Sequence, residues 1–487
     1  MTFLLSLKKL QEKGYESKQK NKIEKELPYF ITIVTLLATS GFGPYFIFKK
    51  MKNFELLPTI RLESDKILKR MQFLGLDPLT VMKQTKDRSS SKALGDFLSG
   101  YASSIQSGGN VMNYLKSKMK NTFDSFAESE KQQVETVKAL IEAYMTLQVV
   151  VLAVFVIFAA VGNNSLSSTP TDESIDYTYY IMLLPLVIAI GFLKIAQGVA
   201  LPKTREINIK KFLLYGLPVI AVSLFLIASG IFSDFGVNPY ILGSAFIVAS
   251  LWPALKFKKI YLASLDAESA TPQILRDITE SRKVGLSPEK CVINACNRKN
   301  FNLFNPIANS ISNKLQWGVP IENIFASLKK QVANFKVLIS FRILFEIISS
   351  GGGNVETLDS LAETSERIYT IEKSKQEMLK PYVMIGFMLI GITGFITLIV
   401  IDTFSDIEMG KETDEVKRAE LSRKSNSAIE AFSLIVVVQS WITGLFLGKI
   451  ITGNYSGGFQ YSIILVIISL TGVIVIQSSI ISMTSLF

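Results

Sequence analysis

The sequence contains no histidine among its 487 residues. Imidazole catalysis, histidine metal ligation and histidine-based pH switching are therefore excluded for this chain. Only two cysteines occur, Cys291 and Cys296, which is too few for a disulfide framework. We expect both to be small core hydrophobes on different faces of one helix. The residue types present also predict no redox chemistry, no metal site and no cofactor.

Charged residues are scarce as well, at 19% of the chain against 48% hydrophobic residues, and the mean hydropathy is +0.33. Uncharged windows of about twenty residues predict membrane-spanning helices, because lipid offers no partner for exposed backbone groups. The windows predict an all-α polytopic membrane protein with about seven transmembrane helices. They cover residues 142–162, 179–197, 212–232, 240–255, 382–401, 432–449 and 461–483.

The distribution of basic side chains predicts the topology, since lysine and arginine beside spans are retained in the cytoplasm. Of the 52 basic residues, 46 fall in residues 1–141, in residues 256–380, in the short loop around Arg205, or at Lys449. Residues 402–430 instead hold eight acids against five bases. We therefore expect a multi-pass protein of the cell membrane, with the amino terminus cytoplasmic and the carboxyl terminus extracellular.

An internal repeat appears at an offset of 244 residues. The matching positions are Pro28 with Pro272, Gly41 with Gly285, Pro44 with Pro288, Phe97 with Phe341, and Gly108-Gly109-Asn110 with Gly352-Gly353-Asn354. Each half therefore reads as a cytoplasmic helical bundle followed by three spans, and an extra fourth span makes the two copies parallel. The predicted divisions are bundles at 1–141 (core about 24–140) and 256–380, with spans at 142–255 and at 381–487, the latter including an outer loop at 402–430.

The repeat also assigns the apolar segment from Tyr29 to Phe48, which hydropathy alone would place in a membrane. Its counterpart from Ile274 to Val292 is too charged for lipid, so we expect a cytoplasmic helical hairpin in both copies. In each, a helix is expected to begin near Pro28 or Pro272, to end at glycine, and to restart near the next proline. Later in each copy, Gly-Gly-Asn is expected to close a helix with positive backbone angles.

Clustered basic residues on the cytoplasmic side are candidates for docking an acidic partner, although topology and attraction to anionic lipid headgroups explain many of them. The clusters are Lys203, Arg205, Lys210 and Lys211; Lys116, Lys118 and Lys120; and Lys329 with Lys330. The chain lacks a nucleic-acid recognition motif and a series of stacking aromatics, so we expect no nucleic-acid partner.

The segment Gly444-Leu-Phe-Leu-Gly448-Lys449 is not a phosphate loop, because the glycine spacing is wrong and no serine or threonine follows the lysine. A GxxxG pair inside a span predicts close helix packing, either within the chain or between two copies. Gln148, Gln439 and Gln477 are expected to hydrogen-bond between helices. No nucleophile with a base can be assembled, so we expect no enzyme.

Taken in order, these features resemble the type II secretion F domain: paired helical bundles, glycine and proline around the first turn as in Gly285-Leu-Ser-Pro288, a Ser-Gly-Gly-Asn type turn, and a span behind each bundle. The glycine series from Gly444 to Gly458 also looks like that family. With two such domains and about seven spans, the chain is most similar to archaeal platform proteins of archaella and type IV pili.

The resemblance implies a membrane platform that couples a hexameric secretion ATPase to the insertion of pilin or archaellin subunits into a filament, with ATP hydrolysed by the partner. It leaves a homodimer possible. The alternative from another class is a secondary transporter or channel, against which the absence of paired carboxylates in the spans counts.

Overall fold

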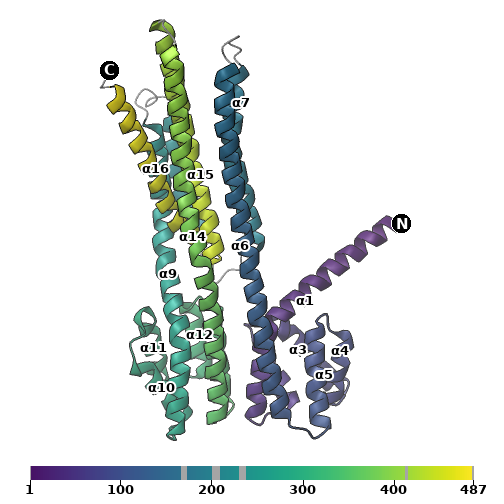
Figure 1. Ribbon diagram of the computed structural model, residues 1–487. Coiled ribbons are helices and arrows are strands. Elements are labelled where there is room, and N and C mark those ends of the chain that lie inside the picture. The colour runs from purple at the N-terminus through teal and green to yellow at the C-terminus, as the bar shows by residue number, and fades with distance from the viewer. Residues whose placement is uncertain are drawn as a thin grey trace. The chain divides into compact units, whose positions relative to one another are not determined.

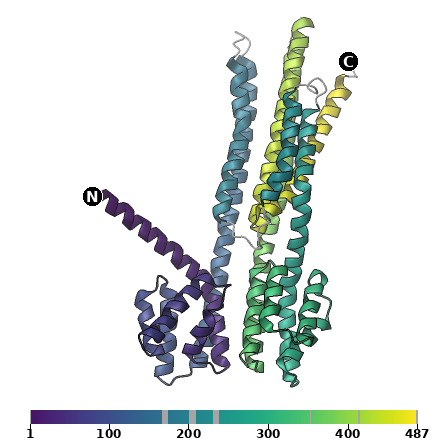
Figure 2. The same cartoon turned by 180° about the vertical axis from the view of Figure 1, so that it is seen from behind.

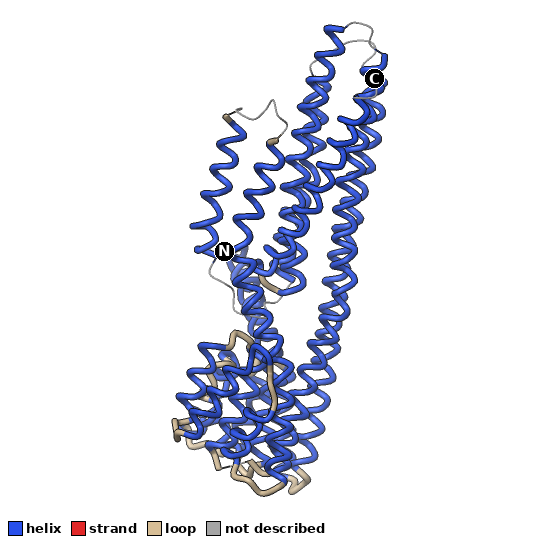
Figure 3. The backbone as a smooth tube through the Cα atoms, turned by 90° about the vertical axis from the view of Figure 1, so that its left-hand side faces the viewer, coloured by secondary structure: helices blue, strands red, loops and turns tan. Residues whose placement is uncertain are grey.

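A computed structural model describes residues 2–165, 173–199, 209–229, 237–351, 353–411 and 415–484. Within these ranges the chain is helical, with no strand (Figure 3). The all-α prediction is therefore confirmed. The helices are α1 (Thr2–Thr39), α2 (Pro44–Met51), α3 (Pro58–Phe73), α4 (Pro78–Arg88), α5 (Lys92–Gln106), α6 (Val111–Ser165), α7 (Glu173–Val199), α8 (Ile209–Ala228), α9 (Asn238–Lys283), α10 (Pro288–Arg298), the short 3-10 helix η2 (Asn302–Phe304), α11 (Asn305–Gln316), α12 (Ile321–Gln331), α13 (Phe335–Ser349), α14 (Val355–Lys411), α15 (Glu415–Thr452) and α16 (Tyr455–Thr484).

The chain divides into two compact units. The first, here called the bundle unit, combines Met1–Lys131 with Leu262–Lys373, and the second, the membrane unit, combines Gln132–Tyr261 with Ser374–Phe487. Within the bundle unit we call residues 1–131 the first bundle and residues 262–373 the second bundle. The two bundles share one hydrophobic core cluster, so they pack as one body.

The helices of the two bundles follow one another in the same order, which Figures 1 and 2 show from opposite sides. Three pairs of left-handed glycines end corresponding helices: Gly41 and Gly285 (both φ +91°), Gly75 and Gly318 (+60° and +66°), and Gly108 and Gly351 (+64° and +76°). The first pair is 244 residues apart, but the other two are 243 apart. The helices α5 and α13, both of 15 residues, are also 243 apart. Phe97 and Phe341 are therefore not equivalent positions, because the sequence register slips by one in the middle of the repeat.

Two expected helix starts are wrong. Pro28 lies inside α1, and α9 runs through Pro272, so neither proline begins a helix. An internal proline removes only one backbone hydrogen bond, at a cost of about 3 kcal/mol, which surrounding packing can offset. Leu27 and Phe30 are fully buried beside Pro28, and its carbonyl accepts a hydrogen bond from the Thr32 hydroxyl at 2.8 Å. By contrast, Pro44 and Pro288 do begin helices, as expected.

The Gly-Gly-Asn turns also differ from expectation in detail. Gly108 and Gly353 have positive φ, whereas Gly109, Asn110 and Asn354 do not. Each asparagine instead caps the following helix, since the side-chain oxygen of Asn110 accepts from the Asn113 backbone N–H and that of Asn354 from Thr357, at 3.0 and 2.8 Å. A capping side chain satisfies a backbone donor that the first helical turn leaves free. Gly352 lies outside the described residues.

The apolar segment of α1 lies in the core of the bundle unit. Tyr29, Phe30, Ile31, Ile33, Val34, Leu36 and Leu37 are all buried there. A helix that is hydrophobic on every side needs burial on every side, and protein provides it here. This explains how so apolar a segment can belong to a bundle: α1 packs against α2, α3 and α5 of the first bundle and against α13 of the second.

Four helices in the described residues contain a segment long and apolar enough to span a membrane, in Val111–Val154, Asn238–Lys283, Glu430–Thr452 and Tyr455–Val475. Shorter apolar segments occur in α7 and α8, at Leu183–Gly198 and Gly216–Ala228. The chain is therefore described as an all-α membrane protein. In the membrane unit, the amide nitrogen of Gln439 donates to the Gln148 side-chain oxygen at 2.9 Å, so both residues hydrogen-bond between helices as expected. The side chain of Gln477 lies outside the described residues.

Glycine determines how closely α15 and α16 pack. A Cβ built on Gly444 would lie 2.2 Å from the Ser462 Cα, and one on Gly448 would lie 2.1 Å from the Gly458 Cα. Both distances are far below any van der Waals contact, so backbone meets backbone at these positions. Of the two packing arrangements expected for the GxxxG pair, this structure has the one within the chain.

Gly448→Ala is expected to lower the stability of the membrane unit by about 2 kcal/mol, because the added methyl group must force two backbones apart. The matched control is Gly472→Ala in α16, where a Cβ would meet nothing within 4 Å. The thermal unfolding midpoint of the purified protein in detergent checks this, and equal midpoints for the two variants would contradict the close approach.

Candidate functional site

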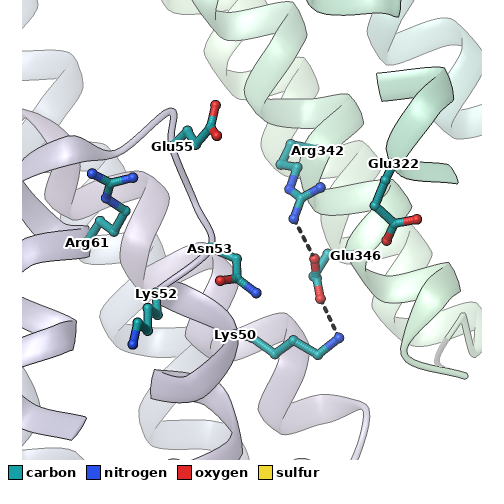
Figure 4. A pocket seen from close by; sticks show the side chains of 8 residues that line it. All are labelled: Lys50, Lys52, Asn53, Glu55, Arg61, Glu322, Arg342 and Glu346. Atoms are coloured by element: carbon teal, nitrogen blue, oxygen red, sulfur yellow. Dashed lines mark hydrogen bonds and ion pairs between the residues drawn. The ribbon is translucent and has the colours of Figure 1, made fainter. Parts of the chain in front are cut away.

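A polar pocket of about 420 Å³ opens within the bundle unit between residues of the first and second bundles. Figure 4 shows the side chains that line it, which come from α2, α3 and the turn between them on one side, and from α12 and α13 on the other. They are Lys50, Lys52, Asn53, Glu55, Arg61, Glu322, Arg342 and Glu346. Four cations and three carboxylates thus converge where the bundles meet.

Glu346 links the two bundles by ion pairs. Its buried carboxylate lies 2.7 Å from the Lys50 ammonium group of the first bundle and 3.0 Å from the Arg342 guanidinium one helical turn away (Figure 4). The Glu346 side chain is only 7% exposed. Burying a carboxylate is costly unless cations compensate it, so removing one member of such a group is strongly destabilising.

Arg342 also contacts an aromatic ring of each bundle. Its guanidinium carbon lies 5.1 Å from the ring centroid of Phe54 in the first bundle and 5.3 Å from that of Phe325 in the second. Guanidinium groups bind aromatic faces at such distances. One arginine therefore connects a carboxylate of its own helix to an aromatic residue of the other bundle. We call the boundary between the first and the second bundle the seam.

A second ion pair between the bundles involves Glu55 of the pocket lining. The Lys329 ammonium donates to the Glu55 carboxylate at 2.7 Å, with both side chains largely exposed. This hydrogen bond, followed by the charges of Lys329, Arg61 and Arg342, lowers the pKa of Glu55. Exposed pairs contribute about 0–1 kcal/mol, so this contact can exchange for a contact with an incoming group at little cost.

The seam continues along α6 and α14 with further polar contacts. Lys116 pairs with Glu356, and the Arg367 guanidinium lies 3.5 Å from the Asp124 carboxylate. Near the start of α14, the Ser40 and Thr357 hydroxyl oxygens are 3.5 Å apart. Exposed polar pairs such as these are typical of surfaces that can separate, unlike the apolar core that the two bundles share.

A buried cluster around Tyr29 of the first bundle includes Phe335, Lys336 and Glu372 of the second bundle. The Tyr29 ring meets the Phe335 ring edge to face at a centroid distance of 5.3 Å, and the adjacent Lys336 pairs with the buried Glu372. Burial raises the pKa of Tyr29 to about 12, outweighing the nearby charge of Lys336. Burial is the largest single effect on the Lys336 pKa and lowers it, but the pKa is raised because the Glu372 carboxylate, Tyr29 and Glu268 together outweigh burial. The lysine therefore stays charged at any physiological pH.

This arrangement presents cations and carboxylates that can bind charged groups. The described residues contain no group of three or more histidine, cysteine, aspartate or glutamate side chains placed to hold a metal ion. Cys291 and Cys296 are both fully buried, and burial raises the pKa of the Cys296 thiol to about 12, so that it stays protonated and inert. The charged groups of the pocket are carboxylates and cations, whose ion pairs can exchange partners.

The structure brings only some of the proposed docking lysines to the seam. Lys116 and Lys329 each form an ion pair across it, while Lys120 and Lys330 are exposed and Lys118 is half-buried. Lys203 and Arg205 lie outside the described residues, as do the side chains of Lys210 and Lys211.

Sequence reasoning missed the central members of the pocket. Lys50 and Glu346 are 296 positions apart, and neither belongs to a motif. One signal was available: Arg342 and Glu346 are charged residues one turn apart within α13, whose other residues are mostly apolar. Charged side chains in a buried helix require ion-pair or hydrogen-bond partners. The two residues therefore indicate that a neighbouring helix supplies a partner, but they do not identify that helix.

Comparison with known proteins gives a distant relative but no family assignment. An uncharacterized protein of Methanocaldococcus jannaschii is 20% identical over 407 aligned positions, which cover 74% of this chain and 65% of the relative. The chain thus spans about two thirds of the length of that relative. No protein-family model matches the chain, and no solved structure matches it.

Glu346→Gln is expected to destabilise the bundle unit by about 3 kcal/mol, because Lys50 and Arg342 lose their shared carboxylate inside the protein. The matched control is Glu363→Gln, which removes an exposed Glu–Arg pair one turn apart on α14 and should cost less than about 0.5 kcal/mol. Urea unfolding of the detergent-solubilised chain measures both, and a loss no larger than that of the control would show that Glu346 does not hold the seam.

Proposed function

We propose that this protein is a membrane platform of an archaeal type IV pilus-like or archaellum assembly machine. In this role it couples a cytoplasmic hexameric secretion ATPase to the insertion of pilin or archaellin subunits into a filament. The chain itself hydrolyses nothing; it transmits movement. Its partners are the ATPase, the filament subunits and the lipids around its spans.

The observation that carries the proposal is the duplication of the bundle. Six helical segments recur in the same order, with left-handed glycines ending the corresponding helices, and each copy continues along the chain into a long helix with an apolar segment, α6 and α14. This is the arrangement for which the sequence resembles the type II secretion F domain. The relative from Methanocaldococcus jannaschii has no described function and adds nothing about activity.

The finer topology belongs to the same proposal. Seven spans would be made by the four long apolar helices together with α7, α8 and the apolar part of α14. An odd number of crossings puts the two termini on opposite sides, and the many basic residues of the first bundle would keep the amino terminus in the cytoplasm. Basic residues then lie on the cytoplasmic side, where both bundles stand.

A seam with exchangeable ion pairs suits a coupling protein. A partner that competes for the charges around the pocket would alter how tightly the bundles associate, and each bundle is covalently continuous with a long helix. Small changes at a packed interface convert into rigid movements because interfaces switch between discrete arrangements. We propose the loop with Lys203, Arg205, Lys210 and Lys211 as the principal electrostatic contact with an acidic ATPase surface.

Reversing the four basic charges of that loop to glutamate is expected to abolish filaments while the protein still inserts. A deletion strain of the source organism, complemented with the wild-type or the reversed gene, allows filaments to be counted by electron microscopy and the protein to be quantified in membranes. Normal filaments in the deletion strain would refute the platform function. Normal filaments in the reversed strain alone would refute only the docking role of this loop.

A further inference from the structure

Large apolar side chains are exposed at one turn of the first bundle and at the equivalent turn of the second. Trp317 is 85% exposed, and Phe73 and Leu74 are 80% and 64% exposed. Leu74 ends α3 and Trp317 ends α11, 243 residues apart, which is the offset of the glycines that follow them. Single exposed apolar residues are ordinary, but a pair on repeat-equivalent turns is not scattered at random.

The two turns have the same construction. Each joins two helices through four residues, with Gly75 or Gly318 in the left-handed conformation at the second position. The residue after the glycine, Leu76 or Val319, packs against the shared core, as is common after such helix ends. The residue before the glycine therefore faces outward, and nothing in the turn requires it to be apolar.

Other helix ends in the bundle unit show what this position usually holds. Serine precedes the left-handed glycine at Gly41, Gly108 and Gly351. At Gly285 the residue is Val284, whose repeat-equivalent is Ser40, so this apolar side chain occurs in one bundle only. The Leu74 and Trp317 turn is thus the one turn in the described bundles where both copies expose a large apolar residue beside the glycine.

We propose that these two turns, here called the twin knobs (Phe73 with Leu74, and Trp317), dock together on two neighbouring subunits of a ring-shaped protein partner. The proposal rests on the proposed function, in which that partner is the secretion ATPase. Two like contacts carried by the two halves of one chain match a partner that repeats one apolar cleft. Aromatic side chains, tryptophan above all, dominate the binding energy of protein interfaces.

Charge also favours an acidic protein surface as the occupant. In the bundle unit, residues 1–131 carry 22 basic side chains against 13 acidic, and residues 262–373 carry 13 against 12. Lys69 and Arg70 precede the first knob and Lys314 precedes the second. Neither knob has the cluster of four or more basic residues by which a protein holds an anionic membrane surface, so lipid is the less suitable occupant.

Two linked contacts bind far more tightly than either alone, because the second forms without a further loss of free motion. Removing one knob should therefore cost much of the affinity. The test uses the full chain in lipid nanodiscs and the purified secretion ATPase of the same organism, with binding measured by biolayer interferometry. Trp317→Ser and the pair Phe73→Ser with Leu74→Ser should each weaken binding by about tenfold or more, and their combination should weaken it further.

Matched controls come from exposed leucines away from the knobs. Leu62→Ser lies eleven residues before Phe73 on α3, and Leu303→Ser lies in η2, and both should leave the affinity within about twofold. Equal binding by all variants would overturn the twin-knob proposal while leaving the platform function intact. No binding by the wild-type chain would instead count against the proposed ATPase partner itself.

A second measurement separates protein from lipid as the occupant. In a chain with Trp252→Phe and Trp441→Phe, Trp317 is the sole tryptophan. Its fluorescence should shift to shorter wavelength when the ATPase is added, as the ring leaves water. Quenching by brominated lipids in the absence of the ATPase would show that the knob contacts the bilayer and would overturn the proposal.

Discussion

Burial of the apolar segment of α1 is the constraint on which the rest of the bundle unit depends. Its residues from Tyr29 to Leu37 could have entered lipid, but they lie in a core to which both bundles contribute. Once this helix is inside protein, the basic residues that follow it can remain on one side of the membrane. The edge-to-face contact of Tyr29 with Phe335 also makes α1 the apolar link between the two copies.

Besides this apolar contact, ion pairs connect the two bundles. The ion pairs of Glu346 with Lys50 and Arg342 are buried and specific, whereas the pair of Lys329 with Glu55 is exposed and weak. The bundles are therefore held more firmly near α1 and α13 than at the pair of Lys329 with Glu55. Such a gradient would let one body flex without coming apart, which suits the proposed platform role.

Much of the architecture could be predicted from the sequence, because it follows from local rules. Hydropathy gave the apolar helices, and glycine with proline gave the turns at Gly41 and Gly285. The prolines at 28 and 272 misled because tertiary packing overrode a local signal for a helix start. The offset of 243 that holds from Gly75 to Gly108 escaped notice because the matches on either side, at Gly41 and at Asn110, hold the offset of 244.

The pocket could not be predicted, since its members come from distant parts of the chain with no spacing rule between them. The charged residues Arg342 and Glu346 in the buried helix α13 indicated that they need ion-pair partners, but not which residues those partners are. The docking role of the loop at residues 203–211 and the number of spans remain proposals, because they concern residues outside the described ranges or helices that are apolar over short segments. The duplication is what ties these proposals together.

The central claim is that the two bundles form one body, and a disulfide across the seam tests it most directly. Ser40→Cys and Thr357→Cys, in a chain whose Cys291 and Cys296 are changed to alanine, place two thiols where hydroxyl oxygens are 3.5 Å apart. Mild oxidation of native membranes should join them nearly completely, as seen by a mobility shift that reductant reverses. If both cysteines instead stay reduced and react freely with a bulky maleimide, the bundles do not pack as one body.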